Sequence, residues 1–355
     1  MKIPFYLLLA ICYLLLFNCR KDAPPSLPNQ GSINLSTGKR LLICDEGNYG
    51  QNNAAVSIFS PLNNLVILSA FTAANPNYTL GDVVQSISKI EGNYYLVVNN
   101  SGTIVVCNGN FVRTATISGF ISPRYIQYVY NGEAYVSNLQ LDSTKQNYIQ
   151  VININTNTIT KTIHINGWTE EMQLANGKVY VCNQSKNYVY VINTQTDALI
   201  DSIFMGTTSA CIVKDENNKL WVSCNSDSTA SIHIPASLVR INPANDSIEA
   251  NINLGTISNA ISRLCINGTG TTLYYLMTNV YKMSITATAC PTTPLIQQGS
   301  HTFYGLCIDP DDETIYVSDA LNYNSNGKLY HYQSNSNLLG TYMVGVIPGF
   351  MMIDE

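Results

Sequence analysis

Polar and aromatic residues recur at two kinds of position along the chain, and their chemistry suits ligand binding. One kind lies at the start of predicted strands, and the other lies at the ends of the strands that follow. Amides donate and accept hydrogen bonds, guanidinium groups bind acceptors in pairs, and tyrosine rings offer flat faces, so a large polar, amide-bearing or planar ligand is favoured over a small anion. The predicted ligand-binding residues are Glu46, Asn48, Gln85, Asn100, Arg124, Tyr125, Asn138, Glu170, Asn183, Arg263, Tyr304 and Asp319.

Each part of this set also has a structural interpretation. An asparagine at a strand end tolerates left-handed backbone geometry and bonds its own turn, so its repetition requires no ligand. Arg124 and Arg263 could each form a structural salt bridge. Glu170 and Glu171 could act as a general acid and base, but two exposed acids in a loop between repeats are the favoured interpretation.

The sequence holds no recognised catalytic or cofactor motif. It lacks a serine nucleophile elbow, a phosphate-binding loop and a dinucleotide fingerprint. The histidines show no ligand spacing to a cysteine, which argues against zinc. Residues 309–313 lack the glycine and closing glutamate of a calcium loop, which favours an acidic turn. We therefore predict a non-catalytic protein with no metal ion and no cofactor.

Composition narrows the class of protein. The chain has 18 Lys and Arg against 23 Asp and Glu, a net charge of −5, so it cannot supply the phosphate contacts that nucleic-acid binding needs. A disordered chain is excluded because 46% of its residues are hydrophobic. The cysteines after Cys19 form no CxxC pair, and most are predicted to be small buried hydrophobic residues.

A repeated unit must position the candidate residues. An aromatic residue followed by an aliphatic residue and, soon after, by Asn or Asp recurs at intervals of about 40 to 45 residues, with one interval of 54. Spacings near 40 to 45 are the length of a four-stranded propeller blade. A β-sandwich, the alternative, would not require an aromatic residue at the same point of every repeat. Seven units fit between residues 38 and 353, so we predict one all-β, seven-bladed β-propeller domain over residues 38–355. The clearest copies are Tyr135-Val136-Ser137-Asn138, Tyr180-Val181-Cys182-Asn183 and Tyr316-Val317-Ser318-Asp319.

The two ends of this domain complement each other. Residues 39–44, 54–59 and 64–71 match the second, third and fourth strands of a unit, so the first unit lacks its innermost strand. The apolar residues 350–353 form a surplus strand at the end of the chain. We predict that these residues supply the inner strand of the first blade, which would leave no open sheet edge.

The N-terminus has the features of an export signal. Lys2 precedes an apolar run over residues 3–17, which is shorter than the roughly 20 residues of a membrane-spanning helix. The run ends in Leu16-Phe17-Asn18-Cys19, which resembles a bacterial lipobox, although Asn18 replaces the usual small residue. An ordinary signal peptide is the alternative. We predict a lipoprotein signal peptide over residues 1–18 and a lipidated Cys19 with a flexible tether over residues 19–37. The protein would then be anchored to the outer membrane, facing either the periplasm or the outside.

The repeat also resembles known families. Its Tyr-Val-x-Asn and Val-x-Val-Ile-Asn rhythm is similar to the secreted YVTN-type (YncE-like) seven-bladed β-propeller family. The segments EGNYG (46–50), GDVVQS (81–86), VNNSG (98–102) and SPRY (122–125) resemble surface propeller lipoproteins of gram-negative bacteria. Some of these capture cobalamin and pass it to an outer-membrane transporter. The resemblance implies a cell-envelope lipoprotein that binds cobalamin or a similar nutrient for such a transporter.

Two other functions remain open at this point. A neutral blade surface rich in Asn and Thr would suit a protein-interaction or adhesion scaffold of the cell envelope. A propeller enzyme, either a lactonase or a quinone-dependent dehydrogenase, should bring metal-binding carboxylates or cofactor-clamping residues to the channel. Only scattered Glu and Asp residues are visible in the sequence, which makes the enzyme the least favoured of the three.

Overall fold

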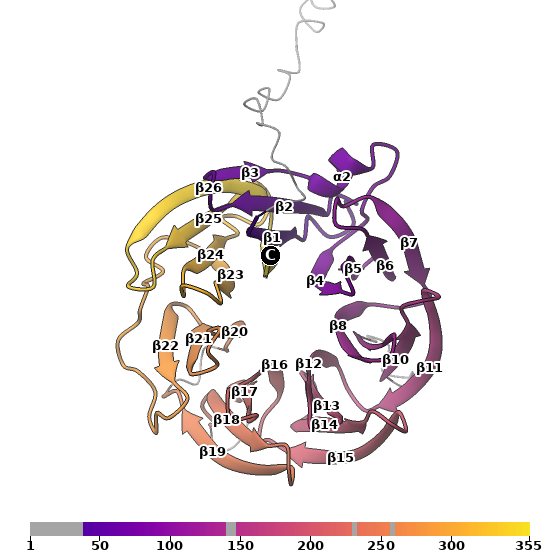
Figure 1. Ribbon diagram of the computed structural model, residues 1–355. Coiled ribbons are helices and arrows are strands. Elements are labelled where there is room, and N and C mark those ends of the chain that lie inside the picture. Colours follow the sequence, from indigo (N-terminus) through magenta and orange to yellow (C-terminus); the bar gives the residue numbers. More distant parts are fainter. Residues whose placement is uncertain (1–37, 140–146, 229–232, 256–259) are drawn as a thin grey trace, which may run out of the picture. The chain divides into compact units, whose positions relative to one another are not determined.

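Seven antiparallel sheets make up the part of the chain that the computed structural model describes, which is residues 38–139, 147–228, 233–255 and 260–355. The sheets stand as blades around a common centre (Figure 1), so the predicted all-β, seven-bladed β-propeller is confirmed. The predicted signal peptide, lipidated Cys19 and tether lie in residues 1–37, outside the described residues. No helix in the described ranges is both long enough and apolar enough to cross a membrane.

The strands of each blade follow one another from the centre outward. Blades 1 to 4 consist of β27 (Pro348–Asp354), β1 (Arg40–Asp45), β2 (Ala55–Ser60) and β3 (Leu65–Ile67); β4 (Val84–Ile90), β5 (Asn93–Val98), β6 (Thr103–Cys107) and β7 (Arg113–Ser118); β8 (Pro123–Tyr130), β9 (Glu133–Asn138), β10 (Asn147–Asn153) and β11 (Thr158–Ile165); and β12 (Thr169–Ala175), β13 (Lys178–Asn183), β14 (Tyr188–Asn193) and β15 (Ala198–Phe204). Blades 5 to 7 consist of β16 (Ser209–Lys214), β17 (Leu220–Cys224), β18 (Ser237–Asn242) and β19 (Ser247–Asn253); β20 (Arg263–Ile266), β21 (Thr272–Leu276) and β22 (Val280–Ser284); and β23 (Phe303–Ile308), β24 (Ile315–Asp319), β25 (Asn326–Tyr332) and β26 (Leu338–Val346). A short helix, α2 (Ala70–Ala74), follows β3.

The hydrophobic core lies between neighbouring blades. The second strands are buried on both faces, as in β5 and β13, because a blade packs against each side of them. One apolar cluster joins Tyr135 and Val151 of blade 3 to Val181 and Ile192 of blade 4. The outer strands are largely exposed, and β15 buries only Ile203.

In blades 3 and 4 the repeated aromatic residue links the blade to the next one. The Tyr135 hydroxyl donates to Asp197 Oδ1 at 2.5 Å, and the Tyr180 hydroxyl donates to Asp246. Both acids lie in the turn between the third and fourth strands of the following blade. At these two positions the buried ring packs within its own blade while its hydroxyl binds the next blade, which explains why the motif carries a tyrosine there.

The last strand of the chain completes the first blade. β27 pairs with β1, and Leu41 lies opposite Ile353. The prediction that residues 350–353 supply this inner strand is therefore confirmed. Because both ends of the propeller share one sheet, β1 is not left with an unpaired inner edge.

A buried carboxylate fastens this closure. Asp354 accepts hydrogen bonds from Arg40 Nε at 2.7 Å and from the Tyr94 hydroxyl at 2.5 Å, and its Oδ1 lies 2.6 Å from Lys89 Nζ. Burial would raise the pKa of Asp354, but bonds from Lys89, Tyr94 and Arg40 hold it below its ordinary value. β27 is thereby bound to β1 in its own blade and to β4 and β5 in blade 2.

Two predicted fourth strands differ from the structure. Residues 64–71 were expected to form one strand, but only β3 forms, and the chain turns at Ser69 (φ 53°) into α2. Blade 6 has three strands, because Pro291 and Pro294 in the segment after β22 lack the N–H groups that a fourth strand would use. A single bridge, between Val280 and Ile296, takes its place in the described part of the blade.

Two smaller predictions are confirmed. The eight described cysteines are free thiols, and six of them are buried. Residues 309–313 form an acidic turn, in which Asp309 and Asp311 bind Lys39 Nζ at 2.7 and 2.5 Å. This turn belongs to blade 7 and Lys39 directly precedes β1, so the ion pairs add to the closure.

Asp354 provides a direct test of the closure. Asp354→Asn removes the charge that Arg40 and Lys89 share inside the protein, so we expect the free energy of unfolding to fall by about 2–4 kcal/mol. Urea unfolding followed by circular dichroism measures the change. Asp201→Asn on the exposed strand β15 is the control and should leave stability unchanged. Equal stability of the two variants would contradict the closing role of Asp354.

Candidate functional site

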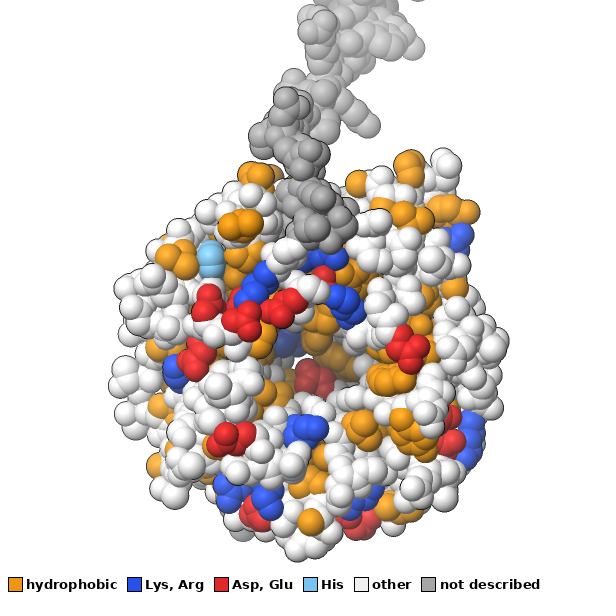
Figure 2. Space-filling view, in the orientation of Figure 1, with side chains coloured by type: hydrophobic (Ala, Val, Ile, Leu, Met, Phe, Trp, Pro, Cys, Tyr) orange, Lys and Arg blue, Asp and Glu red, His pale blue; other side chains and the backbone are white. Residues whose placement is uncertain are grey.

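The two sets of candidate residues meet on one face of the ring, which we call the mouth face. Each inner strand begins and each second strand ends on this face, so that Pro123 of β8 pairs with Asn138 of β9. Residues from every blade therefore approach one central channel, although they are far apart in sequence (Figure 1). Figure 2 views the ring from the opposite face, where β27 ends, and shows it hollowed at its centre, with hydrophobic, basic and acidic side chains around the hollow.

A β-bulge lies at the start of the inner strand in every blade except blade 6. There, one or two residues of the inner strand are left without a direct partner on the second strand. Such a bulge re-aims the side chains, and five of the ten bulged residues belong to the candidate set. The bulged residues are Gln85, Arg124 and Tyr125, Glu170 and Glu171, Ala210 and Cys211, Tyr304, and Gly349 and Phe350.

In blades 3 and 5 the serine of the repeated motif stabilises the bulge. Ser137 Oγ accepts the Tyr125 N–H at 3.0 Å, and Ser223 Oγ accepts the Cys211 N–H at 2.9 Å. A backbone N–H that the bulge removes from the ladder thereby keeps a partner. In blade 3 the Tyr-Val-Ser-Asn motif thus provides both the link to the next blade and the support of the bulge beside the channel.

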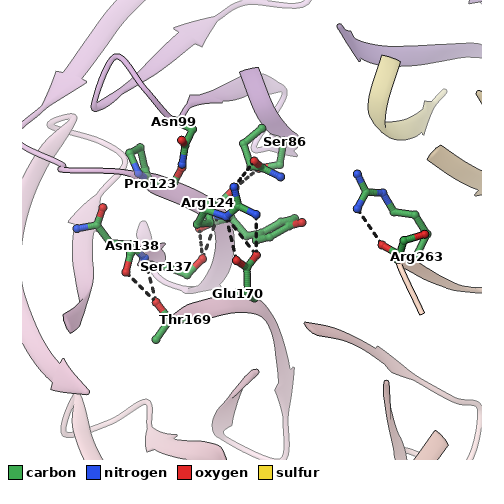
Figure 3. A network of polar contacts seen from close by, with 12 residues as sticks. Ser86, Asn99, Pro123, Arg124, Ser137, Asn138, Thr169, Glu170 and Arg263 are labelled. Atoms are coloured by element: carbon green, nitrogen blue, oxygen red, sulfur yellow. Dashed lines mark hydrogen bonds and ion pairs between the residues drawn. The ribbon is translucent and has the colours of Figure 1, made fainter. Parts of the chain in front are cut away.

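Arg124 organises a polar network on one side of the channel (Figure 3). Its Nε lies 3.1 and 3.2 Å from the two carboxylate oxygens of Glu170, and its Nη2 lies 3.1 Å from Glu170 Oε2. Its Nη1 donates to Gln85 Oε1. Blades 2, 3 and 4 each contribute one of these three side chains. Arg124 therefore forms a salt bridge with Glu170, as its structural interpretation predicted, and the Arg124–Glu170 pair lies beside the channel.

A second group lies on another side of the channel. Both carboxylate oxygens of Glu46 accept the Tyr304 hydroxyl at 3.1 Å. The guanidinium carbon of Arg263 lies 5.7 Å from the centre of the Tyr304 ring. Figure 3 shows Arg263 well apart from the Arg124–Glu170 pair. No described residue forms an ion pair with Arg263, so its structural salt bridge is absent from the described part of the chain.

The two adjacent glutamates lie on strand β12, so the interpretation of two exposed acids in a loop was wrong. Glu170 is 3% exposed and Glu171 is half-buried, because the bulge turns both toward the interior of the ring. Burial raises the pKa of Glu171 to about 7, although Arg263 and the Ile212 N–H act in the opposite direction. Burial also raises the pKa of Glu170, against the effect of Arg124.

Three candidates at strand ends hold loops of the mouth face. Asn138 accepts the Ser122 N–H at 3.0 Å, Asn183 accepts the Lys186 N–H at 2.8 Å, and Asp319 accepts the Leu321 N–H at 2.8 Å. All three are at most 1% exposed. Their positions match the structural interpretation of the repeated strand-end residues.

The remaining candidates lie around the channel wall and its rim. Tyr125 is buried and its ring meets Phe350 edge-on at 6.1 Å. Asn100 donates to Asp82 Oδ2 at 2.6 Å, and Asn48 donates to the Tyr323 carbonyl at 2.8 Å. The structure thus brings seven of the twelve candidates together at the channel. They are Glu46, Gln85, Arg124, Tyr125, Glu170, Arg263 and Tyr304.

Exposed aromatic residues on the mouth face were missed in the sequence. Tyr323 is 45% exposed, has a left-handed backbone (φ 61°) that is uncommon for so large a residue, and meets Tyr304 edge-on at 5.8 Å. Tyr49 is 78% exposed in the loop after β1. Neither residue occupies a repeated position. The only sequence signal for Tyr323 is an aromatic residue within the polar segment LNYNSN (321–326).

A family model covers almost the whole propeller. The family described as "Domain of unknown function (DUF5074)" matches residues 39–340. The chain belongs to this family. The DUF5074 match includes strands of all seven blades and ends before the closing strand β27. No curated protein matches the sequence significantly.

Several solved structures resemble this DUF5074 propeller. A quinonprotein alcohol dehydrogenase-like protein from Bacteroides thetaiotaomicron is 14% identical, with a TM-score of 0.69 over 90% of this chain and 79% of that chain. Hydrazine synthase from Kuenenia stuttgartiensis is 12% identical, with a TM-score of 0.59 over 77% of this chain and 92% of that chain. AztD from Citrobacter koseri is 11% identical, with a TM-score of 0.53 over 89% and 97%. At these identities the likeness shows the fold alone.

Glu171 should make the stability of this DUF5074 propeller depend on pH. Its pKa rises from an ordinary 4.5 to about 7, so between these values the native protein holds a proton that the unfolded chain has released. The free energy of unfolding therefore falls as the pH rises from 4.5 to 7. Glu171→Gln removes this loss, and we expect the variant to be more stable than the wild type at pH 8 by about 1–3 kcal/mol.

Urea unfolding at pH 5 and pH 8 measures this effect. Asp45, whose pKa burial also raises to about 7, is present in both proteins, so its effect cancels in the difference. We expect the gap between variant and wild type to be larger at pH 8 than at pH 5. A gap of the same size at both pH values would show that Glu171 does not titrate in this window.

Proposed function

We propose that this protein is a non-catalytic ligand-binding β-propeller that captures a large polar nutrient, with cobalamin as the first candidate. The bulged inner strands are the main support, because they turn Gln85, Arg124, Glu170 and Tyr304 toward one channel. A bulge costs ladder hydrogen bonds and re-aims side chains, so its recurrence at the same place in six blades supports a role for the residues that it turns.

The spread of these groups favours a wide ligand. Gln85 and Arg124 belong to blades 2 and 3, whereas Arg263 and Tyr304 belong to blades 6 and 7. A single ligand that meets both groups must extend across the mouth of the channel. The exposed rings of Tyr49 and Tyr323 add flat apolar surface beside these polar groups. Cobalamin has a broad ring system bearing amide side chains, which suits this combination.

The proposal extends to the cell envelope. We infer that the resemblance to secreted YVTN-type propellers and to surface propeller lipoproteins reflects a shared role in nutrient capture at the cell envelope. Lipidation of Cys19 anchors the protein to the outer membrane, and residues 19–37 tether the propeller to that anchor. An outer-membrane transporter then receives the captured nutrient. The absence of catalytic activity remains a prediction.

A second candidate function is a protein-interaction or adhesion scaffold. It is supported by apolar side chains on outer strands, where Phe204 of β15 is 60% exposed and Leu338 of β26 is 54% exposed. Copurification with an outer-membrane barrel is expected for either function. The scaffold would be favoured if the Phe204→Ser variant no longer copurified with that barrel and the wild type did not bind cobalamin. The third candidate, a lactonase or quinone-dependent dehydrogenase, is supported only by likeness of fold.

Calorimetric titration with cobalamin tests the proposed function. The wild type should bind cobalamin, and Arg124→Gln combined with Glu170→Gln should weaken binding at least tenfold. This double variant removes both charges together, so it leaves no buried charge without a partner. The lost charge-assisted hydrogen bonds account for the expected size of the effect.

A matched ion pair outside the channel provides the control. Lys178 and Asp246 lie 2.6 Å apart between blades 4 and 5. Lys178→Gln combined with Asp246→Asn should bind cobalamin as the wild type does. Absence of binding by the wild type at millimolar cobalamin would exclude this ligand. Equal weakening in both double variants would move the site away from the channel.

A further inference from the structure

Two arginines at the channel differ in the use of one edge of the guanidinium group. In Arg124, Nε and Nη2 lie side by side and both bind the carboxylate of Glu170 at 3.1–3.2 Å. In Arg263, Nη1 donates to the Ser262 carbonyl at 2.9 Å. The edge formed by Nε and Nη2 takes no part in this bond. The structure gives neither nitrogen of that edge a hydrogen bond within the described residues.

The open edge of Arg263 is partly shielded from water. Its Nε is buried and has no hydrogen-bond partner in the described structure. Burial opposes the charge on Arg263, but its surroundings, which include the carboxyl group of Glu46, keep its pKa above the ordinary value, so the guanidinium stays charged. A buried N–H of a charged group without a partner costs stability unless something else binds it.

The next blade explains why this edge is open. Arg124 of blade 3 meets Glu170 in the inner strand of blade 4. Arg263 of blade 6 instead meets Tyr304 in the inner strand of blade 7, and a tyrosine ring offers the guanidinium a face but no acceptor at that edge. The Tyr304 hydroxyl is turned to Glu46. Blade 6 thus keeps a charged donor pair that its neighbour does not neutralise.

We propose that the Nε–Nη2 edge of Arg263 anchors a singly charged oxyanion group, a carboxylate or a phosphodiester, carried by the captured ligand. Two parallel N–H donors match the two oxygens of either group, as the Arg124–Glu170 pair demonstrates within the same channel. This inference rests on the proposed function, because it names the part of a ligand that the channel recognises.

The other charges of the channel limit the kind of anion. Glu46, Glu170 and Glu171 all lie close enough to Arg263 for its positive charge to oppose the rise of their pKa values on burial. Glu170 is neutralised by Arg124, but Glu46 and Glu171 have no ion-pair partner among the described residues. The negative charge of Glu46, joined by that of Glu171 once the pH exceeds its pKa of about 7, disfavours multiply charged anions, since the repulsion grows with the ligand's charge. A single negative charge on a larger molecule is therefore the favoured match, and free inorganic phosphate is a poor one.

Arginine side-chain NMR on the full chain tests this directly. The chain has only six arginines, so ¹⁵Nε labelling gives few signals, and the Arg263 signal is identified as the one missing from Arg263→Gln. Benzoate, dimethyl phosphate, inorganic phosphate and neutral benzamide serve as probes. We expect benzoate or dimethyl phosphate to shift the Arg263 signal at millimolar concentration, and the stronger of the two identifies the source of the oxyanion. Benzamide and inorganic phosphate should bind more weakly.

Variants separate recognition from folding. Arg263→Gln should weaken binding of the preferred anion at least tenfold and change benzamide binding less than twofold. Arg263→Lys keeps the charge but loses the paired donors, so it should also bind more weakly than the wild type if Arg263→Gln does not fold. Arg113→Gln is the control, because Arg113 lies on the outer strand β7, stacked over Tyr78.

Each outcome decides the inference. Binding of neither anion, binding no better than that of benzamide, or unchanged anion binding in the folded Arg263 variants would overturn it. Cobalamin binding without anion binding would leave the proposed function standing and remove the oxyanion anchor. The wild type could instead bind the anion but not cobalamin, with anion binding lost in Arg263→Gln. That result would support the anchor and exclude cobalamin as the ligand.

Discussion

Pairing between the last strand, β27, and the first strand, β1, is the constraint on which the channel depends. Each blade contributes one inner strand to the centre, so the distances across the channel are fixed only when the ring is closed. Asp354 strengthens this pairing because it binds Arg40 in β1, Lys89 in β4 and Tyr94 in β5 at once. The closure therefore holds blades 1 and 2 together as well as the two chain ends.

The bulged inner strands convert this closed ring into a site. A regular strand alternates its side chains between the two faces of a blade, and those faces are covered by neighbouring blades. The bulge breaks this alternation and turns residues such as Arg124 and Glu170 toward the channel. The motif serine supports the bulge, as Ser137 does for Tyr125, so the stabilising contact and the exposed functional group belong to one repeated unit.

The sequence predicted the fold well because its signals are periodic. The number of blades, the closure by residues 350–353 and the approach of Arg124, Glu170 and Tyr304 to one channel all follow from the repeat. Contacts that break the repeat could not be predicted. Whether an arginine meets a carboxylate or a tyrosine depends on one side chain in the next blade, and Pro291 and Pro294 removed the fourth strand of blade 6 without altering the repeat. The buried position of Glu170 followed from the bulge, which no sequence pattern marked.

Native-state hydrogen exchange tests the closure most directly. If the ring is a single closed unit, the amides of residues 351–353 should exchange only through global unfolding, with the same free energy of opening as the amides of β13 in blade 4. Asp354 and its three partners should hold β27 in place until the whole propeller unfolds. Exchange of residues 351–353 at a clearly lower free energy than β13 would show that the last strand detaches locally, and it would contradict the dependence of the channel on closure.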